Sequence, residues 1–188
     1  MYSIDSGPFW RETRILVYRY LPAEADWDAW SSYPTDGGRF DADQVPTLYV
    51  AQSANGAVAE YLHRFPEFIG LSTRLILRLW ELEVDLVAEA LDVREEAGQA
   101  IVGITLDRLT SQEADTLVRY RECRELVRLV VGAGLAGIAY PSAAATWAGA
   151  WNLVLIGDSH ASSWRGAGVR VVDPPILQQS EVRQLDAG

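Results

Sequence analysis

The order of the strand-like and helix-like segments constrains the fold more than any other feature of this sequence. Only two segments, 53–65 and 111–134, have a clear helical pattern, and residues 86–110 are ambiguous. Apolar runs and alternation predict strands at 14–21, 46–51, 72–85, 137–142, 151–157 and 168–173. Strands therefore outnumber helices without alternating strictly with them. This favours a compact α+β domain, with a mixed or antiparallel sheet and flanking helices, over a doubly wound sheet.

Local signals predict where the two helices begin and end. Ser53 is the predicted N-cap of the first helix, and Pro66 limits its extension. Ser111 is the predicted N-cap of the second helix. The second helix runs into "GAGLAG" (132–137), which fits the G-x-G-x-x-G pattern but lacks the preceding strand and following helix of a dinucleotide fingerprint. We interpret it as a helix C-cap and a tight entry to a strand.

Composition limits the classes of function. The chain has 188 residues and a formal net charge of −10, which argues against non-specific nucleic-acid binding. We expect one domain over residues 1–175, followed by a polar tail at 176–188. The N-terminus does not resemble a signal peptide, and the longest apolar run, 129–140, is too short to span a bilayer. A cytoplasmic protein without a membrane partner is expected.

Metal and triad chemistry have little support in the sequence. Cys123 is the one cysteine, which excludes an internal disulfide, and its helical setting predicts a partly buried structural thiol. His63 and His160 are the two histidines and give little for a transition metal. The adjacent residues "DSH" (158–160) do not form a triad pattern, and "DADQ" (41–44) lacks EF-hand spacing. No metal site is predicted.

Four polar residues lie at positions where either a structural or a functional role is possible. Arg19 shares a strand face with Val17 and could be buried in need of a partner, or could reach water at a strand edge. Arg39 follows two glycines, which allow close approach to a phosphate but also suit an exposed turn. Glu60 lies off the apolar stripe of its helix, and Ser142 follows a proline at a strand end. The residues alone leave each role open.

Six short motifs occur in an order that resembles the RES domain family, named for its arginine, glutamate and serine. The motifs cover most of residues 15–157. They are "YRY" (18–20), "GGRF" (37–40), "TLYVA" (47–51), "AVAEYL" (57–62), "YPSA" (140–143) and "WNLVLI" (151–156). The resemblance implies a toxin of a bacterial toxin–antitoxin pair, with a fold related to ADP-ribosyltransferase toxins.

The family resemblance also implies an activity and a set of site residues. Family members consume NAD⁺ by hydrolysis or phosphorolysis, so NAD⁺ is the expected substrate and inorganic phosphate a possible second one. The arginine, glutamate and serine of the family name fall on Arg39, Glu60 and Ser142, the expected catalytic residues. Further pocket positions fall on Arg19, Tyr20, Tyr49 and Asn152. Where the family often has asparagine this chain has Asp41, which puts phosphate use in question.

The expected mechanism is cleavage of the nicotinamide–ribose bond, with Glu60 stabilising an oxocarbenium-like ribose. Arg39 and Arg19 would hold the pyrophosphate or an incoming phosphate, and Tyr49 would stack on nicotinamide. Ser142 would donate a hydrogen bond to a ribose or amide group. The resemblance further implies an antitoxin that has a helix-turn-helix domain and covers the NAD⁺ pocket.

Two other functions remain open at this stage. The first is a mono-ADP-ribosyltransferase that uses the same site to modify a protein or nucleic acid. The second is a non-catalytic scaffold that only binds a partner.

Overall fold

The computed structural model describes residues 9–10, 14–22, 38–42, 45–66, 77–86, 88–111, 116–157 and 167–172. Several sequence-based predictions lie outside these residues. They concern Gly37 in the turn before Arg39, residues 43–44, the "DSH" segment at 158–160 and the polar tail at 176–188.

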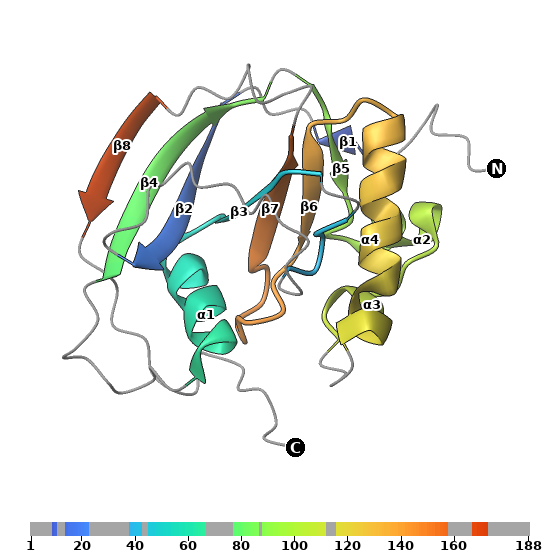
Figure 1. Ribbon diagram of the computed structural model, residues 1–188, viewed down its shortest axis with the longest axis horizontal. Coiled ribbons are helices and arrows are strands. Elements are labelled where there is room, and N and C mark those ends of the chain that lie inside the picture. Colours follow the sequence, from blue (N-terminus) through green and yellow to red (C-terminus); the bar gives the residue numbers. More distant parts are fainter. Residues whose placement is uncertain are drawn as a thin grey trace.

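The fold is α+β and is built on one mixed sheet, as predicted (Figure 1). Its strands are β1 (Phe9–Trp10), β2 (Arg14–Pro22), β3 (Thr47–Ala51), β4 (Leu77–Asp85), β5 (Ala90–Asp92), β6 (Gly137–Pro141), β7 (Trp151–Ile156) and β8 (Ala167–Val172). The spatial order is β1-β5-β6-β7-β3-β2-β4-β8. Strands β5 and β6 pair in parallel and the other neighbours pair antiparallel.

The sheet is nearly divided between β2 and β3. These two strands share a single residue pair, Tyr18 with Ala51, whereas β2 pairs with β4 along its whole length and β3 pairs with β7 along its own. A sheet with so few bonds at one junction can bend sharply there. One side of both halves forms a common core in which Val17 and Leu82 lie in the same buried cluster as Leu153.

The helices are α1 (Ala54–Arg64), α2 (Glu96–Val102), α3 (Leu106–Leu109) and α4 (Thr116–Gly132). Helix α4 buries Cys123 and Val127 in a cluster with Val154 of β7. Because side chains alternate along a strand, Asn152 lies on the same face of β7 as Val154. Asn152 contacts α1, so α1 and α4 cover different parts of one face of the sheet (Figure 1).

The helix-end signals predict the structure well. Ser53 caps α1 by accepting a hydrogen bond from the backbone N–H of Gly56 at 3.1 Å, and α1 ends at Arg64. After α4, Gly134 has φ of +68°, which confirms the predicted C-cap. The next glycine, Gly137, lies so close to the Val154 carbonyl that a Cβ would overlap it. Residues 112–115 lie outside the described residues, so Ser111 stays a predicted N-cap.

The ambiguous stretch at 86–110 contains three short elements, β5, α2 and α3. None is long enough to show a periodic pattern, which is why periodicity does not reveal them. Strand β1, with two residues, is missed for the same reason. Within the described ranges, no helix combines the length and apolar character needed to cross a membrane.

Candidate active site

Glu60 of α1 is held against the ends of two strands. Its Oε1 accepts a hydrogen bond from the Ser142 hydroxyl at 2.7 Å and another from the Asn152 amide at 2.6 Å. Ser142 directly follows β6, and Asn152 is the second residue of β7. From its place off the apolar stripe, Glu60 could be solvated and could pair with Arg64, four residues further along the helix. In the structure Glu60 is only partly exposed, and Arg64 instead lies over the ring of Phe65.

The Ser142 hydroxyl has no free hydrogen left to donate. It donates its one proton to Glu60 and accepts hydrogen bonds from the backbone N–H groups of Ala144 and Ala145, at 3.2 and 3.0 Å. Ser142 is 5% exposed, and its N–H donates to the Ala150 carbonyl. In this geometry Ser142 supports Glu60, and donation from its hydroxyl to a ribose or amide group stays a prediction.

Asn152 and Tyr140 extend the contact from Glu60 into the core. Asn152 is 2% exposed, and its Oδ1 is buried without a partner among the described residues. The pKa of Tyr140 is raised well above its usual value, mainly by burial and further by the Glu60 carboxylate, while Arg39 and a hydrogen bond from Asn152 oppose the shift. Tyr140 therefore stays neutral and lies within electrostatic reach of both Glu60 and Arg39.

Arg39 lies in a tight turn that Asp41 holds through hydrogen bonds to residues of β3. One carboxylate oxygen of Asp41 accepts hydrogen bonds from the Tyr49 hydroxyl at 2.7 Å and from the Thr47 hydroxyl at 2.8 Å. The Tyr49 oxygen in turn accepts from the Phe40 N–H at 2.9 Å. A side chain at Gly38 would overlap both Asp41 and Tyr49, so the turn requires glycine there.

This turn changes the interpretation of Tyr49. Its pKa is raised well above the usual value, mainly by burial and further by the Asp41 charge. A neutral, buried hydroxyl that bridges Asp41 and Phe40 is part of the scaffold that supports Arg39. Stacking of the Tyr49 ring on nicotinamide stays a prediction.

The Arg39 side chain extends to α4. Its guanidinium lies 5.1 Å from the ring centre of Tyr120 and makes a long hydrogen bond of 3.5 Å to the Ser111 carbonyl. Its Nη1 is buried and has no hydrogen-bond partner in the described part of the chain. Beside it, burial raises the pKa of Cys123 to about 11 although Arg39 opposes the shift, so the thiol is protonated at neutral pH, as expected for a structural cysteine.

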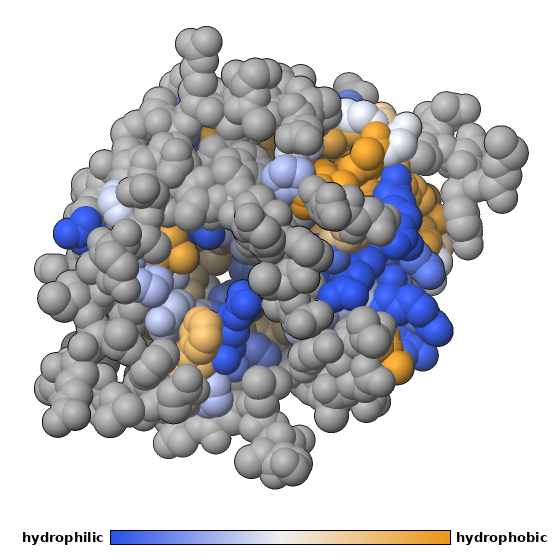
Figure 2. All heavy atoms as spheres, viewed as in Figure 1, coloured by the Kyte–Doolittle hydropathy of each residue, from blue (hydrophilic) through white to orange (hydrophobic). Residues whose placement is uncertain are grey.

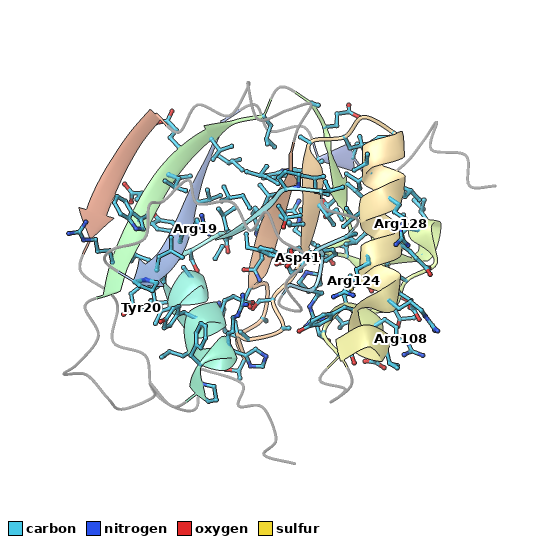
Figure 3. All side chains as sticks on the ribbon, in the orientation of Figure 1. Arg19, Tyr20, Asp41, Arg108, Arg124 and Arg128 are labelled. Carbon is cyan, nitrogen blue, oxygen red and sulfur yellow. The ribbon has the colours of Figure 1, made fainter. Side chains whose placement is uncertain are left out.

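Tyr20 and Arg19 leave β2 on opposite sides. Tyr20 packs edge-on against Tyr61, the residue after Glu60, with 5.3 Å between ring centres. Arg19 lies opposite Trp80 in the register of β2 and β4, on the side of Val17. Figure 3 shows Tyr20 beside α1 and Arg19 beside β2. No contact of the described residues joins Arg19 to Glu60, so its place in the site stays a prediction.

The residues described here contain no group of three or more histidine, cysteine, aspartate or glutamate side chains able to hold a metal ion. Sequence reasoning assigned no role to Tyr140, although it stands in the quoted "YPSA" motif. Its position directly before Pro141 and Ser142 is the one signal that could have drawn attention to it.

Fold and site together define a single-domain α+β protein whose arginine, glutamate and serine come from a turn, a helix and a strand end on one face of a divided sheet. A family model for the RES domain matches residues 9–173. The chain therefore belongs to the RES domain family, as the motif order predicts.

Structural comparison supports the same fold. The crystal structure of the M. tuberculosis MbcT–MbcA toxin–antitoxin complex contains a chain that superposes with a TM-score of 0.66. The match covers 92% of this chain and 95% of that one, at 18% sequence identity. At this identity the similarity shows the fold alone. A comparison with curated proteins finds no match.

Proposed function

We propose that this chain is the toxin of a toxin–antitoxin pair and that it cleaves the bond between nicotinamide and ribose in NAD⁺. The observation that carries the proposal is the state of Glu60. Its Oε1 accepts two short hydrogen bonds, while none of the described residues donates a hydrogen bond to Oε2. A half-buried carboxylate with one oxygen fixed and the other open is suited to accept hydrogen bonds from a ligand.

The chemistry requires no acid to protonate the leaving group, because nicotinamide leaves as a neutral molecule from a cationic pyridinium. The carbon–nitrogen bond breaks with its electron pair on nicotinamide, and the ribose carbon becomes positively charged. Glu60 would accept a hydrogen bond from a ribose hydroxyl through Oε2 and counter this charge. Ser142 and Asn152 would hold the carboxylate in place, so that no reorganisation is needed during the reaction.

Arg39 is the proposed phosphate-binding residue. Its buried Nη1 lacks a partner within the described ranges, and a phosphate oxygen would provide one. Asp41 Oδ1 accepts hydrogen bonds from the hydroxyls of Thr47 and Tyr49, so this carboxylate oxygen supports the turn. Participation of Arg19, and of inorganic phosphate as a second substrate, belongs to the same proposal.

The proposed partner is an antitoxin. Family membership and the similarity to a chain of the MbcT–MbcA toxin–antitoxin complex support this part of the proposal. The helix-turn-helix domain of the antitoxin, and a segment of it that covers the site, are predictions from the family resemblance. A toxin that consumes NAD⁺ acts on the cytoplasmic pool, so a cytoplasmic location is part of the proposal.

The test is NAD⁺ loss by the purified chain, free of antitoxin, with and without phosphate. Chromatography would identify ADP-ribose if water is the acceptor, or a phosphorylated ADP-ribose if phosphate is. NAD⁺ labelled in its adenylate part would reveal transfer to a macromolecule. The matched variants are Glu60→Gln and Glu125→Gln, because Glu125 is an exposed residue of α4. Loss of NAD⁺ that Glu60→Gln abolishes and Glu125→Gln preserves is the expected result. Intact NAD⁺ would overturn the proposal.

A further inference from the structure

A second arginine, Arg124 of α4, has a buried nitrogen without a partner. Its Nε is buried, and no described residue accepts a hydrogen bond from it. No ion pair joins Arg124 to the described part of the chain, whereas its neighbour Glu122 pairs with Arg108 of α3 at 3.5 Å. Because residues two apart in a helix do not face each other, Glu122 does not lie beside Arg124. Arg39 and Arg124 each keep a buried guanidinium donor unused.

Helix geometry brings Arg124 toward Arg39. Tyr120 and Arg124 are four residues apart on α4, so they lie on neighbouring turns of one helix face. Long side chains in a helix lean toward its N-terminus, which directs Arg124 toward the turn that holds Tyr120. Arg39 lies over the Tyr120 ring and contacts Cys123. Figure 3 shows Arg124 between α4 and the labelled Asp41, two residues along the chain from Arg39.

We infer that Arg39 and Arg124 together form a binding site for a diphosphate group. This inference rests on the proposed function, in which the diphosphate is that of NAD⁺. Two guanidinium groups offer parallel N–H donors that match phosphate oxygens in geometry as well as in charge. Arg124 would be the binding residue that the family motifs do not include, since it lies in "RECREL" (121–126).

The energetics favour a ligand at this position. A buried donor without a partner costs about 1–3 kcal/mol, and more when the group is charged. Two like charges close together also repel each other. A dianionic group relieves both costs at once, because it neutralises the charge and accepts from each donor. The local positive charge is needed in a chain of net charge −10, which otherwise repels an anionic substrate.

The surface around Arg124 is polar. Figure 2 shows hydrophilic residues over α3 and the lower part of α4, and hydrophobic residues at the upper end of α4. Arg124 lies on the lower part of α4, and Arg108 lies on the neighbouring α3 (Figure 3). Arg128, one turn further along α4, is exposed and therefore serves as the matched control.

The experiment separates the anion site from the reaction. Binding is measured by calorimetry in the Glu60→Gln chain, using ADP-ribose, inorganic pyrophosphate, inorganic phosphate and nicotinamide riboside, which has no phosphate. Arg124→Gln should weaken the binding of ADP-ribose and of pyrophosphate about tenfold or more, because one charge-assisted hydrogen bond is lost. Nicotinamide riboside should bind unchanged, and Arg128→Gln should leave all four affinities unchanged. Arg124→Lys, which keeps the charge but loses Nε, should fall between.

The outcomes distinguish the two proposals. If Arg124→Gln leaves the affinities for ADP-ribose and pyrophosphate unchanged, the inference is wrong. It is also wrong if only the affinity for inorganic phosphate falls, because Arg39 and Arg124 would then bind a phosphate co-substrate. An equal loss of affinity for nicotinamide riboside also overturns the inference, because the effect of the substitution would then be structural. If Arg124 controls pyrophosphate binding but the wild-type chain leaves NAD⁺ intact, the anion site stands and the proposed reaction fails.

Discussion

The two polar regions on the helix-covered face of the sheet differ in how completely their hydrogen bonds are satisfied. Around Glu60, donors from two strands meet one carboxylate oxygen at 2.6 and 2.7 Å. Around Arg39 and Arg124, two buried guanidinium nitrogens have no partner among the described residues. The first region is organised by the chain itself. The second is incomplete, and an anion would complete it.

The difference has a physical reason. A carboxylate that must stabilise developing charge works best when it is fixed before the substrate arrives. A group that must bind and release an anion gains affinity when its donors are not already used by the protein. Fixing Glu60 therefore serves the chemical step, and leaving the arginines open serves binding. The predictions below test this division of roles.

The largest effect is expected for Glu60→Gln. Glutamine can still accept from Ser142 and Asn152 through its amide oxygen, so the fold should be retained while the negative charge is lost. Turnover of NAD⁺ should fall by about 100- to 1000-fold, the range seen when one preorganised electrostatic group is removed. Single-turnover kinetics with saturating NAD⁺ measures this directly. A variant that turns over at the wild-type rate would remove Glu60 from the mechanism.

Arg39→Gln should produce opposite changes in activity and stability. The value of kcat/KM should fall about 10- to 100-fold through a higher KM, because a charge-assisted hydrogen bond to the diphosphate is lost. The ligand-free chain should be as stable as wild type or more stable, since an incompletely paired buried charge is removed. Steady-state kinetics and urea unfolding measure the two quantities. A large loss of stability would show that Arg39 is mainly structural.

Substitutions at Asp41 test how the turn that carries Arg39 is held, independently of ligand binding by Arg39. Asp41→Ala removes the acceptor for Thr47 and Tyr49 and should lower the free energy of unfolding by about 2–3 kcal/mol. Asp41→Asn keeps an acceptor oxygen at the same position and should cost less than half as much. Urea unfolding of both variants provides the comparison. Equal destabilisation by the two substitutions would mean that the charge, and not the acceptor, holds the turn.

Much of the fold is predictable from the sequence because the long elements carry strong local signals. The cap at Ser53, the break before Pro66 and the glycine after α4 each act within a few residues, so pattern reasoning finds them. The strand excess also identifies the α+β class. Short elements without a clear apolar run, such as β1, β5 and α2, depend on tertiary contacts, and the sequence pattern does not reveal them.

The site is less predictable than the fold. Periodicity shows only that Glu60 lies off the apolar stripe of its helix, and only the ordered family motifs indicate a site. The contacts that decide its state come from Ser142 and Asn152, which are 82 and 92 residues away in sequence. Local patterns hold no information at such separations. The same is true of Arg124, whose unused donor becomes visible only when burial and hydrogen bonds are known.

Ser142→Ala tests whether Ser142 positions Glu60 or binds substrate. Removing the hydroxyl deletes one of the two hydrogen bonds on Oε1 and leaves the N–H groups of Ala144 and Ala145 without their acceptor. If Ser142 is a positioning residue, kcat should fall about tenfold, the cost of one hydrogen bond, with little change in KM. Ser142→Thr, which keeps the hydroxyl, should restore most of the rate. A change confined to KM would instead make Ser142 a substrate ligand.

The last prediction concerns the alkaline loss of stability caused by the buried phenols of Tyr49 and Tyr140. Their pKa values are raised in the folded chain, mainly by burial, whereas the unfolded value stays near 10.0. Below pH 10 both states keep these protons and the phenols add no pH dependence. Above it the unfolded chain loses protons that the folded chain retains, so stability falls by roughly 1.4 kcal/mol per pH unit for each phenol. The pKa of Cys123 is raised from 9.0 to about 11, so this thiol adds a similar loss of stability above pH 9.

Tyr49→Phe measures the share of this pH dependence that comes from Tyr49. The variant should be less stable than wild type at pH 8, because the bridge between Asp41 and the Phe40 N–H is lost. Between pH 10 and 11 its stability should fall less steeply than that of wild type, because one titrating group is gone while Cys123 and Tyr140 remain. Urea unfolding at several pH values measures both slopes. Parallel slopes would mean that the Tyr49 hydroxyl reaches water in the folded chain, and the turn beneath Arg39 would then be less firmly fixed than the Glu60 region.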